Sequence, residues 1–297
     1  MTKKSGYVAI VGRPNVGKST LMNHLIGQKI AITANKPQTT RNRIQTVYTD
    51  ERGQIIYLDT PGIHKAETKL GEFMVDAALR TIPDADVVLY LVEPCEKIGK
   101  GDEVILEKLR NCGKPVILIL NKVDRADSEA VEKTEELFRA SAEFRKIVRV
   151  SALRGTKVSK VTDAIFSLLP EGPLYYDEDT LTNVPMRDLA AEIVREKALR
   201  LLQDEIPHGI ACVTEQMKQR KNGLYDVDVT IYTEKESHKG IIIGKGGSML
   251  KKIGTAARAD IETMTENKVN LKLFVKVREN WKDNEAILKS FGYREEP

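Results

Sequence analysis

Short apolar runs alternate with segments of helical periodicity from residue 7 to about residue 169. The apolar runs, each bounded by polar or turn-forming residues, are 7–11, 55–58, 87–92, 116–120 and 147–150. Helical spacing of apolar residues marks 20–26, 102–110, 129–145 and 158–169. Because buried parallel strands read as continuous apolar runs between helices, this pattern predicts an α/β fold with a mostly parallel, doubly wound sheet.

The pattern changes after residue 186, where helix and strand signals no longer alternate. An amphipathic helix is predicted over 186–205, and strands over 210–213 and 225–232 are separated by a turn at Asn222-Gly223. Residues 240–254 hold an apolar segment, a glycine turn and a helix, and 269–277 predicts a last strand with alternating apolar residues. This order predicts an α+β domain, in which Trp281 packs in the core with a terminal helix.

A stretch rich in chain breakers separates the two patterns. Pro170, Gly172, Pro173 and Pro185 flank the acidic run 177–179, which is typical of an exposed linker. The length of 297 residues also favours about two domains. We therefore expect domains at 1–169 and 186–297, joined by a linker at 170–185.

The composition describes a globular chain with 41% hydrophobic and 30% charged residues. Its apolar runs are far shorter than the roughly 20 residues that a membrane-spanning helix needs. Cys95, Cys112 and Cys212 are scattered without metal-type spacing, so they are predicted to be free thiols in a reducing, cytoplasmic compartment. The net charge of +4 says little about partners by itself.

The loop between the first predicted strand and helix carries the pattern of two glycines with four residues between them, followed by Lys and Ser. Backbone N–H groups of such a loop converge on phosphate oxygens, Lys18 would reach the β and γ phosphates, and Ser19 would bind Mg²⁺. A plain glycine-rich turn is the structural alternative. The predicted phosphate-binding residues are Gly12, Arg13, Pro14, Asn15, Val16, Gly17, Lys18, Ser19 and Thr20.

Three more motifs follow the ends of predicted strands, where ligands of open α/β sheets bind. Asp59 could hold Mg²⁺ through water, and the Gly62 N–H could sense a γ-phosphate. Asp124 could accept two hydrogen bonds from guanine, which adenine cannot offer in that arrangement. Each motif alone is an ordinary turn, but their order is that of a guanine-nucleotide switch. The predicted residues are Asp59, Thr60, Pro61, Gly62, Asn121, Lys122, Asp124, Ser151, Ala152 and Leu153.

Residues 7–169 with these motifs resemble a translation-factor-related GTPase domain with a phosphate-binding P-loop. The resemblance implies that Thr39-Thr40-Arg41 forms the first switch segment, with Thr40 meeting Mg²⁺ and the γ-phosphate and Thr39 as the fallback. Ile63 stands where Ras-like relatives carry a water-orienting Gln, which predicts slow hydrolysis or help from elsewhere. The resemblance suggests K⁺ recruited by Asn15 as that help, although Asn15 as a simple loop former is an equal alternative.

The glycine turn of the second domain is surrounded by positive charge. Residues 235–258 hold six Lys or Arg against one acidic residue, whereas 186–297 holds 20 basic and 18 acidic residues. The order of elements resembles a type II KH domain, whose Gly-x-x-Gly turn clamps single-stranded RNA. A basic helix-helix connection is the structural alternative. The predicted RNA-binding residues are Gly244, Lys245, Gly246, Gly247, Lys251 and Lys252.

Together and in this order, the two halves resemble the Era family of bacterial ribosome-assembly GTPases. The resemblance implies GTP and GDP as ligands, Mg²⁺ as cofactor, and the 3′ end of small-subunit ribosomal RNA in the assembling 30S subunit as partner. It also implies peripheral association with the inner membrane, and we expect a monomer. The alternatives are a GTP-gated RNA-binding module and a tRNA-modification GTPase, which would need cofactor and catalytic residues not found in the second half.

Overall fold

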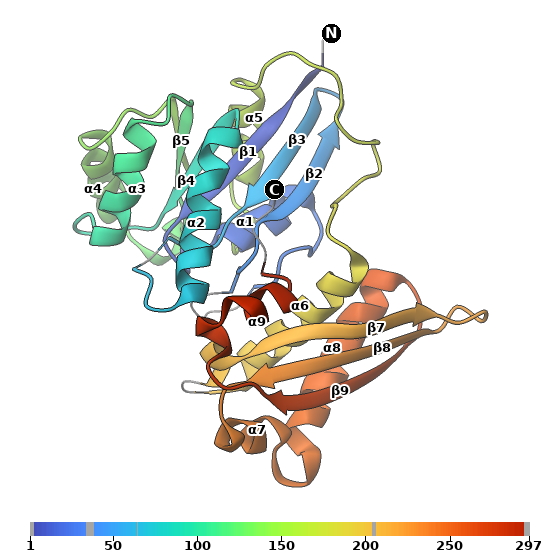
Figure 1. The fold of residues 1–297 in the computed structure, drawn as a ribbon. Coiled ribbons are helices and arrows are strands. Elements are labelled where there is room, and N and C mark those ends of the chain that lie inside the picture. The colour runs from blue at the N-terminus through green and yellow to red at the C-terminus, as the bar shows by residue number, and fades with distance from the viewer. Residues whose placement is uncertain (1–2, 34–38, 64, 204–205, 294–297) are drawn as a thin grey trace. The chain divides into compact units, whose positions relative to one another are not determined.

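The computed structural model describes residues 3–33, 39–63, 65–203 and 206–293 (Figure 1). The chain divides into two compact units. Unit one comprises residues 1–33, 40–67 and 71–183, and unit two comprises 34–39, 68–70 and 184–297.

The described residues of unit one form a six-stranded sheet with the order β2-β3-β1-β4-β5-β6. Every neighbouring pair is parallel except β2 and β3, which pair antiparallel. The strands are β1 (Lys4–Gly12), β2 (Ile44–Asp50), β3 (Gly53–Asp59), β4 (Val87–Val92), β5 (Val116–Leu120) and β6 (Lys146–Arg149). The predicted α/β class is confirmed, and each of the five predicted strands corresponds to one of these elements.

The helices of unit one include one that the sequence analysis did not predict. They are α1 (Lys18–Ile26), α2 (Lys69–Asp84), α3 (Lys100–Arg110), the short η1 (Val123–Arg125), α4 (Ser128–Arg139) and α5 (Val158–Phe166). The prediction missed α2 as well as strand β2. It also placed the end of α4 at residue 145, which is wrong because the helix ends at Arg139 and the Arg145 N–H donates to Val116 O to begin strand pairing. Helix α5 ends at Phe166 rather than at 169.

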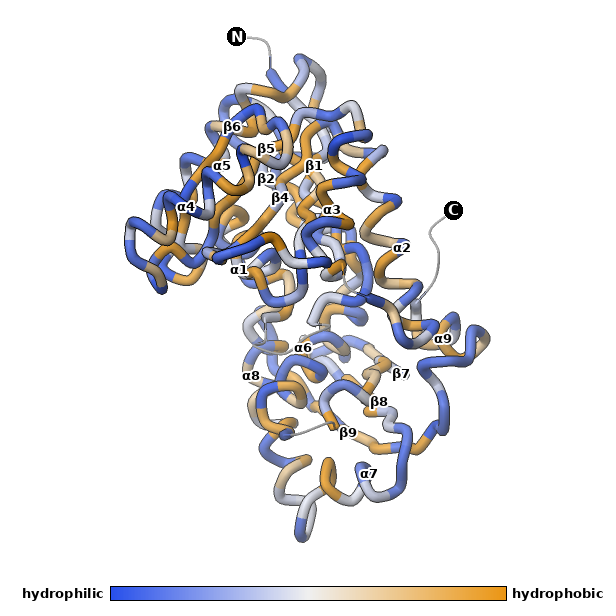
Figure 2. Tube along the Cα trace, turned by 90° about the vertical axis from the view of Figure 1, so that its left-hand side faces the viewer, coloured by the Kyte–Doolittle hydropathy of each residue, from blue (hydrophilic) through white to orange (hydrophobic). Residues whose placement is uncertain are grey.

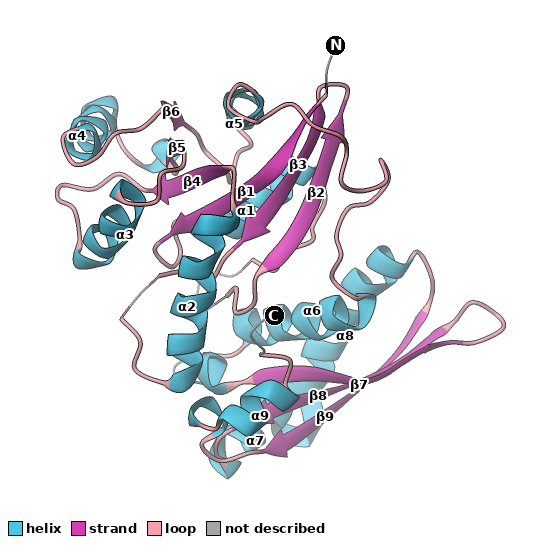
Figure 3. Cartoon of the chain, turned by 45° about the horizontal axis from the view of Figure 1, so that its top comes forward, coloured by secondary structure: helices cyan, strands magenta, loops and turns pink. Residues whose placement is uncertain are grey.

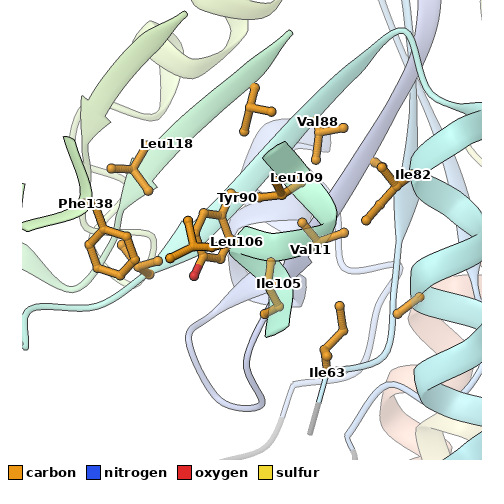
Figure 4. Packing of buried hydrophobic residues seen from close by; sticks show 14 of the residues in the cluster. Val11, Ile63, Ile82, Val88, Tyr90, Ile105, Leu106, Leu109, Leu118 and Phe138 are labelled. Atoms are coloured by element: carbon orange, nitrogen blue, oxygen red, sulfur yellow. The ribbon is translucent and has the colours of Figure 1, made fainter. Parts of the chain in front are cut away.

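The core of unit one lies on both faces of its central strands. Every residue of β4 and β5 is buried, and the tube is strongly hydrophobic along them in Figure 2. On one face, side chains of α2, α3 and α4 pack over β1, β4 and β5, and Tyr90 of β4 meets Phe138 of α4 edge to face (Figure 4). Two-sided burial explains why these strands appear as continuous apolar runs in the sequence.

The segment predicted as an exposed linker is hydrogen-bonded to unit one. The Val47 N–H donates to Leu181 O at 2.8 Å, and the Thr182 hydroxyl donates to Gln45 O at 2.6 Å. The side chain of Gln54 accepts from the N–H groups of Tyr175 and Tyr176 and donates to Tyr176 O. These bonds tie residues 175–182 to β2 and β3.

Among its described residues, unit two is a three-stranded sheet with the helices of residues 186–201 and 248–265 packed on one face (Figure 3). The order is β7-β8-β9, antiparallel between β7 and β8 and parallel between β8 and β9. Its elements are α6 (Met186–Leu201), η2 (Ile206–Gly209), β7 (Ala211–Gln219), β8 (Tyr225–Thr233), α7 (Glu236–Ile243), η3 (Lys245–Gly247), α8 (Ser248–Thr265), β9 (Val269–Val277), η4 (Trp281–Asp283) and α9 (Glu285–Ser290). The predicted α+β class is confirmed.

Unit two follows the sequence prediction in most details, but the strand predicted over 210–213 runs from Ala211 to Gln219. The predicted turn at Asn222-Gly223 joins β7 to β8, and alternating residues of β9 pack against the core with α6 and α8. Trp281 is fully buried, and its Nε1–H donates to Gly209 O at 3.1 Å, so the expectation of a core role is confirmed. The helix predicted to reach residue 205 ends at Leu201, and positions 204 and 205 lie outside the described residues.

Candidate nucleotide site and RNA-binding turn

The predicted phosphate loop joins β1 to α1. Asn15 and Gly17 have left-handed backbones, with φ of 63° and 102°, which bend the loop around the start of the helix. Lys18 is buried, and its ammonium group donates to the carbonyl oxygens of Gly12 at 3.1 Å and Arg13 at 3.0 Å. Burial lowers the pKa of Lys18 to about 8, opposed by the charge of Asp59. A cation held inside such a loop is placed to meet phosphate oxygens.

Three oxygen-bearing side chains converge beside the loop. The Ser19 hydroxyl lies 2.8 Å from Asp59 Oδ2 and 2.8 Å from the Thr40 hydroxyl. Asp59 Oδ1 is buried without a hydrogen-bond partner among the described residues, and burial raises the pKa of Asp59 to about 6. A buried carboxylate oxygen without a partner, next to two hydroxyls, fits the all-oxygen coordination that Mg²⁺ prefers.

The segment after β3 packs directly on the phosphate loop. The Ile63 N–H donates to Gly12 O at 3.2 Å, and the Thr60 hydroxyl donates to Ile10 O at 2.7 Å. A Cβ at Gly62 would lie 2.6 Å from the backbone of Pro14, so no larger residue fits there without a shift. The Ile63 side chain points into the hydrophobic core (Figure 4), so it takes no part in orienting water.

Asn121 ties the predicted base-binding loops to the phosphate loop. Its Nδ2–H donates to Val16 O at 2.8 Å, and its Oδ1 accepts from the Ala152 N–H at 2.9 Å. The amide therefore joins three segments that are far apart in the sequence. These two hydrogen bonds give Asn121 a positioning role that the sequence motif alone did not specify.

The side chain proposed to read guanine lies at the edge of these loops. Hydrogen bonding from Ser151 lowers the pKa of Asp124, and Arg154 Nε lies 3.6 Å from Asp124 Oδ2. Lys122 is anchored by an ion pair with Glu93 at 2.6 Å, and Leu153 is exposed. The structure thus brings the ends of β1, β3, β5 and β6 to one edge of the sheet, with their predicted site residues.

The Gly-Lys-Gly-Gly turn lies between α7 and α8. Gly244, Gly246 and Gly247 have φ of 74°, 59° and 78°, all in the left-handed region that favours glycine. No atom lies within 4 Å of a Cβ built at Gly246 or Gly247. Lys245, Lys251 and Lys252 are exposed and form no ion pair with any described residue. The turn therefore presents open backbone and unpaired positive charge.

The fold and the two sites define a P-loop GTPase domain followed by a KH domain. Residues 7–122 match the family model described as 50S ribosome-binding GTPase, and residues 205–282 match the KH domain model. The chain is 54% identical over 291 residues to GTPase Era of Clostridium botulinum, covering 98% of this chain and 99% of the relative. It is also 54% identical over 294 residues to GTPase Era of Alkaliphilus metalliredigens, covering 99% and 100%. The chain belongs to the Era family of GTPases.

Two solved structures have nearly the same fold along the whole chain. One is Aquifex aeolicus Era, as a variant bound to GDP·AlF₄⁻, and the other is Era in complex with MgGDPNP and nucleotides 1506–1542 of 16S ribosomal RNA. Each is 39% identical, has a TM-score of 0.93, and is matched over 98% of this chain and 99% of its own. Within the described residues, none of the helices is long and apolar enough to cross a bilayer.

Proposed function

We propose that this GTPase uses its nucleotide state to control binding of small-subunit ribosomal RNA, near the 3′ end, during assembly of the small subunit. The observation that carries the proposal is the full-length match to the Era structure that holds both MgGDPNP and the 16S RNA segment. The family model for residues 7–122 names the 50S subunit instead. The 16S segment favours the small subunit because it is bound by a relative that also contains the KH half.

In the proposed nucleotide site, Ser19, Thr40 and Asp59 hold Mg²⁺, and Lys18 turns from its carbonyl partners to the β and γ phosphates. When bound, Mg²⁺ neutralises charge that builds up on the phosphate oxygens during transfer. The chain's own contribution is a preformed loop, with backbone N–H groups oriented by the start of α1. Gly62 then provides the N–H that distinguishes GTP from GDP.

We also propose that K⁺, held through Asn15, assists hydrolysis. The support is twofold: Asn15 occupies a left-handed position within the phosphate loop, and the Ile63 side chain is buried in the core. Turnover of GTP is expected to be higher in KCl than in NaCl at equal ionic strength, and Asn15→Ala should remove the difference. Equal turnover of the parent in both salts would leave Asn15 as a loop former only.

The proposed RNA site is the turn from Gly244 to Gly247 with Lys251 and Lys252. Open glycine backbone lets phosphates approach closely, and the lysines supply charge. A filter-binding assay would measure affinity for the 3′ segment of 16S RNA and for a shuffled sequence, with a GTP analogue and with GDP. Preference for the 16S segment and a difference between nucleotides are expected. Equal binding of both RNAs would contradict sequence recognition by this half.

The two alternatives make different predictions in the same assay. A GTP-gated RNA-binding module without an assembly role would bind unrelated single-stranded RNA as well as the 16S segment. A tRNA-modification GTPase would prefer tRNA, but the KH-domain match over residues 205–282 favours the ribosomal RNA function.

We further propose a monomeric, cytoplasmic protein with at most peripheral contact with the inner membrane. The support is membership of the Era family and three free cysteines.

A further inference from the structure

A buried carboxylate lies behind the phosphate loop, in the first turn of α3. The side chain of Asp102 has no exposed surface, and its Oδ1 accepts a hydrogen bond from the Tyr90 hydroxyl at 2.8 Å. Tyr90 belongs to β4, and Figure 4 shows its hydroxyl among apolar side chains of α3. Burial raises the pKa of Asp102, opposed by Tyr90 and Arg13. A charge in this position is costly unless it is paired.

The partner of this carboxylate is a phosphate-loop residue. Arg13 Nε lies 2.8 Å from Asp102 Oδ2, although its N–H does not point along the line of a good hydrogen bond. The aliphatic stem of Arg13 lies against Gly101, where a Cβ would be 3.2 Å from Arg13 Cδ. A Cβ at Gly99 would lie 3.7 Å from the guanidinium. Glycines at the start of α3 thus leave room for the arginine over its anchor.

The backbone of the same short segment faces the nucleotide site. The carbonyl of Arg13 accepts from the Lys18 ammonium, and the next residue, Pro14, is the backbone that lies against Gly62. Gly12 O accepts from the Ile63 N–H. Residues 12–14 are therefore held on one side by Asp102, and on the other side they contact Lys18 and the Gly62 segment, which are assigned to the γ-phosphate.

We propose that Asp102 is a positioning residue for GTP binding and hydrolysis, acting through Arg13. The carboxylate fixes the guanidinium, and the fixed arginine holds residues 12–14 where they meet both Lys18 and the Gly62 segment. Asp102 itself touches no nucleotide. Removing the charge of Asp102 releases residues 12–14 on the side that faces the γ-phosphate. The affinity for GTP therefore falls more than the affinity for GDP.

Two variants isolate the ion pair. Asp102→Asn keeps the size and an acceptor for Tyr90 but removes the charge, and Arg13→Met keeps the apolar stem over Gly101 but removes the guanidinium. Dissociation constants for a non-hydrolysable GTP analogue and for GDP, with kcat, KM and Tm, would be measured in the full chain. Each single variant should weaken binding of the GTP analogue about tenfold and of GDP about threefold or less, and the double variant should resemble the worse single variant.

Asp163→Asn is the matched control because Asp163 forms an exposed ion pair with Arg52 at 2.7 Å in the same unit. It should leave nucleotide affinities unchanged. If Asp102→Asn lowers Tm while the ratio of the two affinities stays at the parent value, Asp102 is a stability element only. If the two single effects add, Asp102 does not act through Arg13. Either outcome overturns the proposal. Should Asp102→Asn fail to fold, Arg13→Met provides the test, because the Arg13 side chain is partly exposed. An unchanged ratio of the affinities for the GTP analogue and for GDP in Arg13→Met would overturn the proposal.

Discussion

Two glycine-rich turns in this chain are both proposed to bind phosphate, yet they are built in opposite ways. At the phosphate loop of unit one, glycines are required by neighbours: a Cβ at Gly17, in the loop itself, would clash with Asn121 Nδ2, and one at Gly62, in the segment packed on the loop, would lie 2.6 Å from the Pro14 backbone. A Cβ built at Gly246 or Gly247, by contrast, would have no atom within 4 Å. At these two positions glycine is required only by the backbone angle, whereas a Cβ at Gly244, the first glycine of the turn, would lie 2.8 Å from the Met249 backbone nitrogen.

The difference has a physical consequence for recognition. Side chains from several strands surround the nucleotide loop, so one defined ligand can be read through buried partners. The turn between α7 and α8 offers open backbone at Gly246 and Gly247 and exposed lysine charge, which suits a flexible chain of phosphates. We therefore expect substitutions in the first site to abolish or switch specificity, and substitutions in the second to weaken affinity in smaller steps.

Asp124→Asn tests whether the first site recognises guanine through the two hydrogen bonds that the Asp124 carboxylate would accept. The substitution removes the double acceptor for guanine, so the preference for GTP over xanthosine triphosphate should fall by about 1000-fold or more. Competition binding with both nucleotides measures the ratio. Asp127→Asn is the control because Asn can still accept from the Ala130 N–H at the start of α4. An unchanged ratio in Asp124→Asn would show that another group reads the base.

Gly62→Ala tests the close contact in the phosphate loop. Because the added methyl group would overlap the Pro14 backbone, either the loop or the following segment must move, and affinity for a GTP analogue should fall about 100-fold. Calorimetric titration of the full chain measures this loss. Gly172→Ala is the matched control, since a Cβ there meets nothing within 4 Å. Parent-like affinity in Gly62→Ala would mean that the contact is easily relieved.

Replacing both Lys245 and Gly246 by Asp tests charge at the second turn. Asp tolerates the left-handed backbone at Gly246 better than most residues, so the fold should survive. RNA affinity should fall about 30-fold, with a shallower salt dependence, because phosphate contacts are lost. GTP binding should be unchanged. The double Asn variant has nearly the same shape without the two added negative charges, so equal losses in both variants would exclude repulsion by the new carboxylates as the cause.

Gly246→Ala gives the smallest expected effect and separates backbone angle from contact. The methyl group enters open space, so only the left-handed strain of about 1 kcal/mol remains, and RNA affinity should fall about fivefold. Gly240→Ala, within α7 and equally open, should have no such effect. A loss as large as that of the double Asp variant would show that this turn, too, is defined by close contacts.

The sequence predicted the strands and motifs of unit one because both are local signals. Each motif directly follows a strand that is buried on both faces, so its position at the sheet edge follows from its position in the chain. Strand β2 was missed because polar residues interrupt it, as in Gln45-Thr46, and no continuous apolar run marks it. Helix α2 carries Gly71 and Pro83, which hide its periodicity.

Contacts between distant residues could not be predicted in the same way. Nothing in the sequence around Asp102 indicates that it faces Arg13, because the pairing depends on where α3 starts relative to β1. The amide of Asn121 belonged to a predicted motif, but its bonds to Val16 and Ala152 required the assembled sheet. Roles within a motif are therefore local, whereas the partners that hold a motif in place are not.

The bonds of residues 175–182 to β2 have a consequence for how unit one can be isolated. Strand β2 is the outermost strand on its side of the sheet, and uncovered outer strands are templates for aggregation between molecules. The Val47 N–H and Gln45 O, which would otherwise be open to a neighbouring molecule, are occupied by Leu181 and Thr182. A GTPase fragment that stops at residue 169 would lose this cover, whereas one that extends to residue 183 would keep it.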